Sequence, residues 1–205
     1  METYLNDELR LQISDRFKNN VNDVVDISDE YLLNPENNSL TVYPIKHADI
    51  WQSYKVQQAA NWTAEEIDFS KDRDDFETLS KDEQHYIKRI LGFFAASDGI
   101  VNFNLATRFL NELVPMEATV CYTYQMMMEN IHSESYSLML DNLVSDSTER
   151  EFLFNSIKNV ESIKVISDWA FKWINSTDHF GYRVIAFAIF EGVFFSGAFA
   201  AIFWL

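Results

Sequence analysis

Apolar side chains along most of this chain recur at steps of three and four residues, which is the spacing of one face of an α-helix. Between residues 80 and 105 this stripe includes Leu91, Phe94 and Val101. The pattern predicts helices over residues 46–60, 81–111, 115–142, 148–158, 160–175 and 180–205. The chain has only five glycines and three prolines to interrupt them. The sequence therefore predicts an all-α bundle of long helices.

Helix starts are marked by capping sequences. Segments of the Ser/Thr-x-x-Glu type begin at Thr63, Ser80 and Thr148, and Pro115 suits the first turn of a helix. Residues 1–39 lack the helical period and contain acidic and Asn-rich stretches, which predicts an N-terminal arm. No Gly- or Ser-rich linker divides the rest, so we expect one domain over residues 40–205.

Composition and charge narrow the classes of function. The 205 residues include 16 Lys and Arg against 32 Asp and Glu, a net charge of −16. This argues against a nucleic-acid partner, because phosphate binding needs clustered basic side chains. A single cysteine, Cys121, excludes an intrachain disulfide and a cysteine-based zinc cluster. Without a signal-like N-terminus, the chain is expected to be cytoplasmic.

One position in the apolar stripe of residues 81–111 holds a carboxylate. Asp98 comes four residues after Phe94 and three before Val101, in a slot that the helical spacing assigns to the core. An unpaired buried carboxylate is costly or stays protonated, so it needs a cation or a hydrogen-bond donor. The alternative is that Asp98 lies at the edge of the stripe and hydrogen-bonds locally.

The predicted helix over residues 115–142 carries polar groups at the centre of its inner side. Glu129 and His132 are three residues apart, so they project from the same side of the helix, one turn apart. Helical bundles hold di-iron and di-manganese centres with this Glu-x-x-His arrangement. Alone, the motif is also typical of a satisfied surface pair. The presence of Asp98 on another helix favours a metal site.

The last 22 residues, 184–205, contain a single charge, that of Glu191. Such a run is a candidate membrane span, here a tail anchor, although a charge near the middle of a span is unfavourable. A central bundle helix that is buried on all sides has the same composition. The potential ligands on three helices are then Asp98, Glu129, His132 and Glu191. This carboxylate-rich half-site suits iron or manganese better than structural zinc, and it favours the bundle over the membrane protein.

Four longer segments carry a family resemblance: YPIKHADIWQSYKVQQAANWTAEEIDFSKD (43–72), FFAASDGIVNFNL (93–105), MENIHSESYSLMLD (128–141) and FEGVFFSGAFAAIFWL (190–205). Together they resemble the class I ribonucleotide reductase small subunit in its eukaryote-like and viral form. The resemblance runs from about Leu40 to Leu205. A related ferritin-like oxidase is the nearest competitor, but the WTAEEIDFSKD block does not suit it. The resemblance implies a ferritin-like fold for the helical bundle.

The resemblance also implies an oxidoreductase that serves deoxyribonucleotide biosynthesis for DNA replication. In this family a dinuclear iron centre, or a manganese centre in some members, reacts with dioxygen and oxidises a tyrosine to a stable radical. The radical equivalent then passes to a large subunit, which reduces ribonucleotides. The expected cofactor is therefore a pair of iron ions, with manganese as the alternative, and the expected partners are the large subunit and a second small subunit.

The family's functional positions map onto eight residues of this sequence. By motif, the metal ligands would be Asp98, Glu129, His132 and Glu191. Tyr136 looks like the radical tyrosine and Trp62 like the electron-relay tryptophan, while Phe195 and Phe199 match the apolar pocket beside the radical. Without the motif, Tyr136 and Trp62 would be interpreted as core or interface aromatics.

The sequence departs from the family pattern after this set. The family's second Glu-x-x-His, its relay aspartate and its docking tail for the large subunit find no match. We expect one half of a split small subunit, completed by a second polypeptide. The alternatives are a truncated product and a non-catalytic chain that pairs with an intact small subunit. The split-subunit hypothesis predicts that the isolated chain binds metal weakly and forms no tyrosyl radical.

Overall fold

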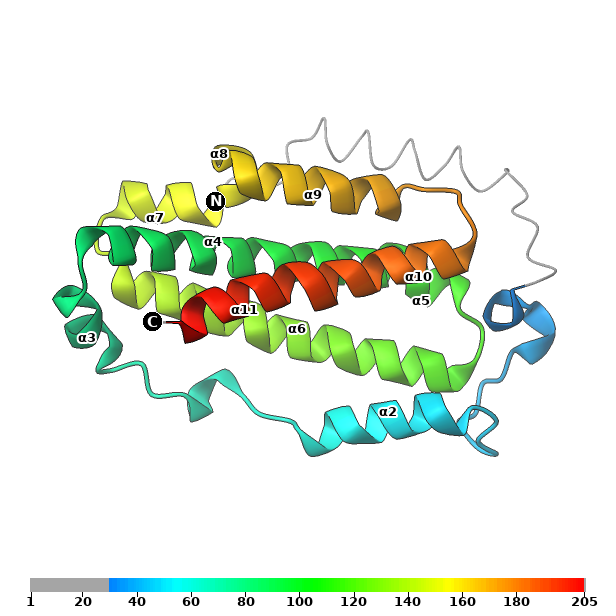
Figure 1. Cartoon of the computed structure of the whole chain (residues 1–205). Helices are drawn as coiled ribbons and strands as arrows, with labels where there is room; N and C mark the ends of the chain where they lie inside the picture. The colour runs from blue at the N-terminus through cyan, green and yellow to red at the C-terminus, as the bar shows by residue number, and fades with distance from the viewer. Residues whose placement is uncertain (1–29, 205) are drawn as a thin grey trace.

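The computed structural model describes residues 30–204, and this part of the chain is helical without any strand (Figure 1). Its α-helices are α2 (Ala48–Ala59), α3 (Asp72–Thr78), α4 (Lys81–Asn104), α5 (Leu110–Glu112), α6 (Met116–Leu143), α7 (Ser147–Phe154), α8 (Ser156–Asn159), α9 (Glu161–Ile174), α10 (Phe180–Ile189) and α11 (Phe195–Phe203). Short 3₁₀ turns are η1 (Tyr31–Leu33), η2 (Pro35–Asn37) and η3 (Ala64–Glu66), and π-helical turns are η4 (Leu105–Phe109) and η5 (Phe190–Phe194). The all-α prediction is confirmed. Most of the predicted arm over residues 1–39 lies outside the described residues.

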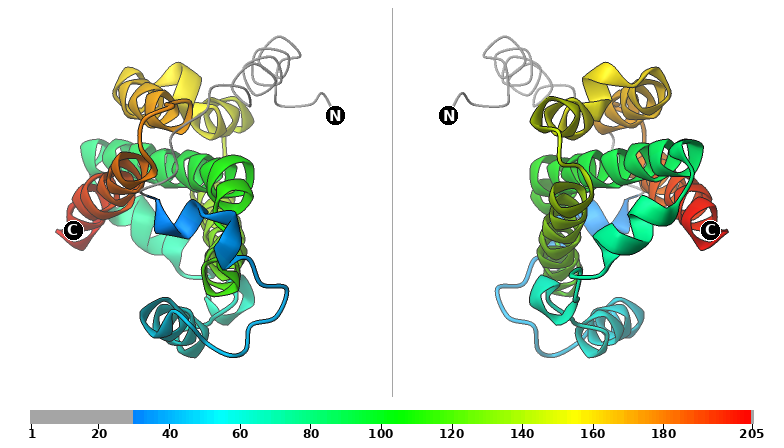
Figure 2. Two further views of the ribbon diagram at one scale, coloured as in Figure 1. Left: turned by 90° about the vertical axis from the view of Figure 1, so that its right-hand side faces the viewer. Right: turned by 90° about the vertical axis from the view of Figure 1, so that its left-hand side faces the viewer.

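The bundle is organised around α4 and α6, which lie side by side along most of their length (Figure 1). The continuous rod α10–η5–α11 packs against α4, and α7, α8 and α9 lie over α4 on the far side from α6. Helix α2 packs along the outer side of α6, as the end-on views in Figure 2 also show. Side chains that point inward from α4, α6 and the α10–α11 rod therefore meet in the middle of the bundle.

Helix starts follow local capping, with one correction to the sequence analysis. The predicted capping box at Ser80 forms: the backbone N–H of Ser80 donates to Glu83 Oε2 at 2.7 Å, and Glu83 N–H donates to Ser80 Oγ. The predicted box at Thr148 is wrong, because α7 already begins at Ser147. Its cap is Asp146, whose Oδ1 accepts from Glu149 N–H at 2.8 Å. A carboxylate is an equally favoured cap, and here it comes two residues earlier.

Two further differences concern element boundaries. The predicted helix over 148–158 is two helices, α7 and α8, that break at Asn155. Helix α3 was not predicted, because it carries little apolar periodicity. It begins instead with three aspartates in its first turn, which interact favourably with the helix dipole.

The apolar C-terminal run is not buried on all sides, so its interpretation as a fully buried central helix is wrong. Arg183, Phe190 and Phe195 are buried on one face, whereas Val193 and Phe203 on other faces are exposed. By length and composition, both Lys81–Glu112 and Phe180–Phe203 could span a membrane, with 56% and 22% of their most apolar windows buried, respectively. Core helices of soluble proteins pass the same test, so this result is weak evidence for a membrane protein.

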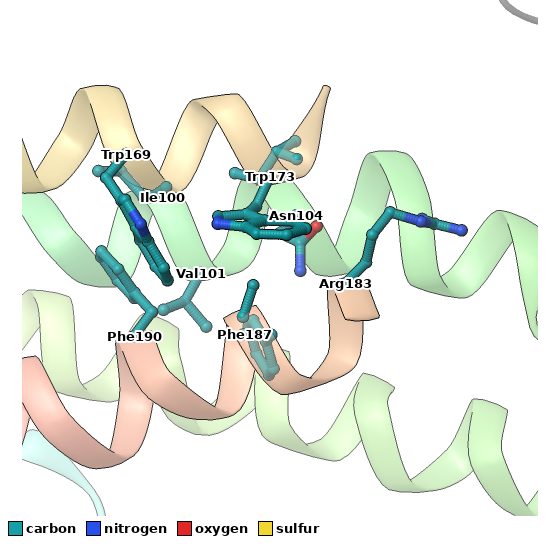
Figure 3. A pocket seen from close by; sticks show the side chains of 11 residues that line it. Ile100, Val101, Asn104, Trp169, Trp173, Arg183, Phe187 and Phe190 are labelled. Carbon is teal, nitrogen blue, oxygen red and sulfur yellow. The ribbon is translucent and has the colours of Figure 1, made fainter. Parts of the chain in front are cut away.

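Helix α9 closes one side of the core with two tryptophans. Trp169 and Trp173 face α4 and α10 across a small cavity of about 20 Å³ (Figure 3). This space is large enough for about one water molecule. The Trp169 ring also contacts Phe194 edge-on, with centroids 5.3 Å apart. Both side chains therefore serve as packing residues, as predicted for the tryptophans other than Trp62.

A buried ion-pair network joins the end of the α4 rod to α10. The Arg183 side chain, 5% exposed, donates through Nη1 to Glu112 Oε1 at 2.9 Å and through Nη2 to Oε2. Arg108 Nε donates to the same Oε1 at 2.7 Å. Burial opposes ionisation of Glu112, but the hydrogen bonds and charges of the two arginines outweigh it and lower its pKa. This contribution to stability is present above the ordinary glutamate pKa and is lost as the pH falls through the folded-state value.

Glu112→Ala is expected to lower the free energy of unfolding by about 3 kcal/mol, because it leaves the buried Arg183 guanidinium without its carboxylate. Denaturant unfolding at neutral pH measures this loss. The control Glu149→Ala removes the more exposed pair with Lys88 and should cost less than about 1 kcal/mol. Equal losses in the two variants would contradict the structural role of the network.

Candidate metal centre

One cavity of about 330 Å³ lies between α4, α6 and the η5–α11 segment. The structure brings all eight predicted site residues to its wall: Trp62, Asp98, Glu129, His132, Tyr136, Glu191, Phe195 and Phe199. They come from positions up to 137 residues apart in the chain, which the packing of three helices and the η3 loop brings together. Their placement agrees with the predicted roles, which remain predictions.

The tightest group in the cavity consists of three side chains. One potential ligand atom from each of Asp98, Glu129 and His132 lies within 4.8 Å of the others. His132 Nδ1 is 3.0 Å from Glu129 Oε2, which follows from their three-residue spacing on α6. Asp98 and Glu129 are buried and His132 is partly buried. The group has the size and the donor atoms to surround one divalent cation.

Asp98 is the residue that most clearly needs a cation. It is 1% exposed, and both of its carboxylate oxygens are buried without a hydrogen-bond partner. Burial, followed by the charges of Glu129 and Glu191, raises the Asp98 pKa to about 8. Because no local hydrogen bond forms, the alternative interpretation of Asp98 as an edge residue is wrong. Two free oxygens aimed at a histidine and a glutamate fit a metal ion.

Glu191 lies on the same cavity but outside the group of three. It sits on the π turn η5, a feature that often occurs inside helices at functional sites. Burial, followed by the charge of Glu129, raises the Glu191 pKa to about 8. Three donors around one position and a fourth carboxylate beside them correspond to one cation position and part of a second.

Gln125 is a site residue that the sequence analysis placed on the inner side of α6 without giving it a role. Its Nε2 donates to Glu129 Oε1 at 3.3 Å and to Glu191 Oε1 at 3.2 Å. It thereby holds together two carboxylates that would otherwise repel. Its position four residues before Glu129 was the signal available in the sequence, since this spacing places both side chains on one face.

Tyr136 lies one turn beyond His132 on α6, against the apolar end of the cavity. Its ring stacks on that of Phe94, with centroids 4.7 Å apart and planes at 13°. Phe94 in turn contacts the rings of Phe195 and Phe199. Burial, followed by the charges of Asp98 and Glu129, raises the Tyr136 pKa well above its usual range. The phenol therefore keeps its proton at neutral pH in a largely apolar setting.

Trp62 reaches the cavity from the η3 loop that follows α2. Its indole stacks on the His132 imidazole, with ring centroids 5.6 Å apart and planes at 27°. The capping box of η3 fixes the loop, because Thr63 N–H donates to Glu66 Oε1 at 3.2 Å. An oxidisable ring thus contacts a metal-ligand candidate directly. The remaining histidines stay outside the cavity, as predicted; His179, for example, caps α10.

These side chains define the chemistry available at the site. Carboxylate oxygens and an imidazole are the ligands of iron and manganese, and an oxidisable phenol and an indole lie next to them. The phenylalanines on one side limit the access of water. The arrangement is suited to one-electron oxidation of a side chain next to a metal centre.

Comparison with known proteins places this site in a family. Residues 39–205 match the family model for the ribonucleotide reductase small chain. The ribonucleoside-diphosphate reductase small chain of swinepox virus (strain Kasza) is 52% identical over 176 residues, which cover 86% of this chain and 64% of the relative. Subunit M2 of the Rattus norvegicus enzyme is 52% identical over 180 residues, which cover 87% of this chain and 46% of the relative.

A solved structure gives the same result for the fold. The ribonucleotide reductase Rnr4 homodimer from Saccharomyces cerevisiae matches with a TM-score of 0.78 and 33% sequence identity, over 94% of this chain and 62% of that one. This likeness confirms the ferritin-like prediction for the fold. The chain spans about half to two thirds of the length of the relatives that it matches.

Asp98→Asn is expected to stabilise the metal-free chain and to weaken metal binding. A neutral amide of the same shape replaces a carboxyl whose ionised form is penalised by burial, so the midpoint of thermal unfolding should rise by a few degrees. The rise that Mn²⁺ gives to the unsubstituted chain should disappear. Calorimetry with and without Mn²⁺ measures both effects. The control Asp74→Asn, on the exposed side of α3, should change neither. A metal-dependent rise that survives Asp98→Asn would exclude Asp98 as a ligand.

Proposed function

The chain belongs to the ribonucleotide reductase small-chain family, and we propose that it acts as the radical-generating small subunit, or as one part of a split small subunit, of a ribonucleoside-diphosphate reductase. The observation that carries the proposal is the meeting of eight predicted residues at one cavity. The unpartnered oxygens of Asp98 support a metal at that place more strongly than any other feature.

The ligand set of the proposed centre is Asp98, Glu129, His132 and Glu191, with iron as the expected metal and manganese as the alternative. When bound, two iron ions would supply the reduction of dioxygen that leaves an oxidising equivalent for a nearby side chain. Gln125 keeps Glu129 and Glu191 in place beside each other. The raised pKa of Glu191 means that ligation replaces a proton on this side chain by a cation.

Tyr136 is the proposed site of the stable radical. Its oxidation removes one electron from the ring and the proton from the phenolic oxygen. The stacked Phe94, together with Phe195 and Phe199, excludes reductants from one side of the ring. Trp62 is the proposed relay, because stacking on His132 gives its indole a direct contact with a metal ligand. Through this contact an electron can leave or enter the cavity.

A dinuclear carboxylate centre in a helical bundle uses a carboxylate from each of two helices and a Glu-x-x-His from each of two others. Asp98, Glu191 and the pair Glu129–His132 account for three of these helices, and this sequence contains one Glu-x-x-His. The fourth helix is therefore proposed to come from another polypeptide. It would cover the side of the cavity where Phe199 is 38% exposed. A large subunit and a second small subunit complete the proposed assembly.

A test of this function uses a tyrosyl radical as the readout. The chain is co-expressed with the part of the swinepox small chain that lies outside the match, loaded with Fe²⁺ under argon and exposed to oxygen. Electron paramagnetic resonance should then detect a tyrosyl radical. Tyr136→Phe should abolish it, because phenylalanine has no phenolic hydrogen to lose. Tyr122→Phe, which removes a partly buried phenol on the same helix but outside the cavity, should leave it intact.

Two results would count against the proposal. A radical that persists in Tyr136→Phe would exclude Tyr136 as its site. Stoichiometric iron without any radical in the co-expressed protein would favour the non-catalytic alternative, in which the chain only assembles with an intact small subunit. The chain loaded alone should give neither a stoichiometric centre nor a radical.

A further inference from the structure

A row of oxidisable rings runs between α2 and α6, away from the phenylalanine-rich core. It consists of Tyr43, Trp51, Tyr54 and Tyr124, and we call it the aromatic row. Consecutive ring centroids are 6.0 Å apart for Tyr43 and Trp51, 5.1 Å for Trp51 and Tyr54, and 5.7 Å for Tyr54 and Tyr124. All three separations are those of rings in direct contact.

The two ends of the aromatic row are at different places. Tyr43, at the outer end, is 69% exposed, whereas the other three side chains are partly buried. At the inner end, the hydroxyl of Tyr124 donates to Asn61 Oδ1 at 2.9 Å. Asn61 is bonded to Trp62, whose indole stacks on His132. The row therefore extends from the protein surface to the cavity with one hydrogen bond and one peptide unit as its longest link.

The composition of the row differs from that of the core. Printed side by side, the ring contacts around α4 and α10–α11 are made mostly by phenylalanine, for example Phe94 with Phe195 and Phe109 with Phe187. Every ring of the aromatic row is a tyrosine or a tryptophan. These two side chains can lose one electron at potentials that biological oxidants reach, and phenylalanine cannot. Packing between α2 and α6 alone would not require this selection.

We propose that the aromatic row is a conduit for single electrons between Trp62 and the protein surface at Tyr43. The proposal rests on the proposed function, because that function is what would oxidise Trp62. The conduit would return an electron to the cavity from a soluble one-electron reductant such as ascorbate or a reduced flavin. It would thereby protect the site when an oxidising equivalent is not used.

The transfer balances in electrons and protons. Oxidised Trp62 takes one electron from Tyr124, and each ring is then reduced by the next one outward, until Tyr43 takes an electron from the external reductant. A tyrosine releases its phenolic proton to water when it is oxidised and recovers one when it is reduced. Every ring ends in its resting state. In total the reductant loses one electron and Trp62 gains it.

Lys55 gives the row a point of control. Its ammonium nitrogen lies 5.6 Å from the ring centroids of both Trp51 and Tyr54. A cation over a ring stabilises the neutral ring and opposes the positive charge of an oxidised indole. The ammonium group therefore slows transfer through Trp51, so that an oxidising equivalent is not drained from the cavity too readily. Removing this charge should make the row conduct better.

The test uses the metal-free chain, so that its result does not depend on whether the proposed function is right. A Cys121→Ser chain with Thr41→Cys, next to the outer end of the row, carries a ruthenium tris(bipyridine) label. Under argon, a light flash and a soluble electron acceptor oxidise the label, which then removes an electron from the protein. A nitroso spin trap marks the radicals, and peptide mass spectrometry counts the adduct at Trp62.

Four variants distinguish conduction from packing. Trp51→Phe and Tyr124→Phe should each abolish the Trp62 adduct, since each interrupts the row. Trp51→Tyr should retain the adduct, because it restores an oxidisable ring at the same place. Tyr86→Phe, a half-exposed tyrosine on α4, is the control for general loss of a phenol and should have no effect. Circular dichroism shows whether each variant is folded.

Lys55→Met should increase the Trp62 adduct about two- to fivefold, the factor that corresponds to a cation–π contact at an exposed site. An unchanged or smaller yield would contradict the role given to the ammonium group. Trp62 adducts in Trp51→Phe and Tyr124→Phe at the level of the unsubstituted row would overturn the conduit itself. The same conclusion would follow if Trp51→Tyr lost the adduct while remaining folded.

Discussion

Asp98 places a carboxylate with no hydrogen-bond partner inside a core of apolar side chains, and the rest of the site is arranged around this constraint. Its neighbours Glu129 and Glu191 add negative charge to the same space and raise its pKa further. Such a cluster lowers the stability of the metal-free protein. A metal cation converts this unfavourable feature into a binding site, which is why the carboxylates are retained in the core.

The helices position this cluster with little help from loops. The long rods α4 and α6 hold Asp98 and the Glu129–His132 pair at fixed heights, and the π turn η5 turns Glu191 toward them. The apolar outer faces of the α10–α11 rod then remain exposed, with Val193 at 60% and Trp204 at 79%. A contiguous apolar surface of this kind is typical of an interface. It agrees with a proposed fourth helix that both covers this face and completes the metal ligands.

Much of the fold and site could be predicted because the relevant residues interrupt a regular pattern. Asp98, Glu129 and Glu191 are visible as charges within apolar stripes, and the scarcity of glycine and proline favours long helices. What remained hidden depends on tertiary packing. The π turn η5, the bridge from Gln125 to two carboxylates and the exposure of the C-terminal run have no periodic signal in the sequence. The competition between Asp146 and Thr148 as helix caps was likewise decided only by the folded chain.

The central claim is that carboxylates from three helices form a metal site in this chain. Anomalous X-ray diffraction from crystals grown with Mn²⁺ under argon tests it most directly, because it locates the metal without relying on activity. The account predicts an anomalous peak between the side chains of Asp98, Glu129 and His132. Mn²⁺ bound at other positions, with no peak in this cavity, would contradict it.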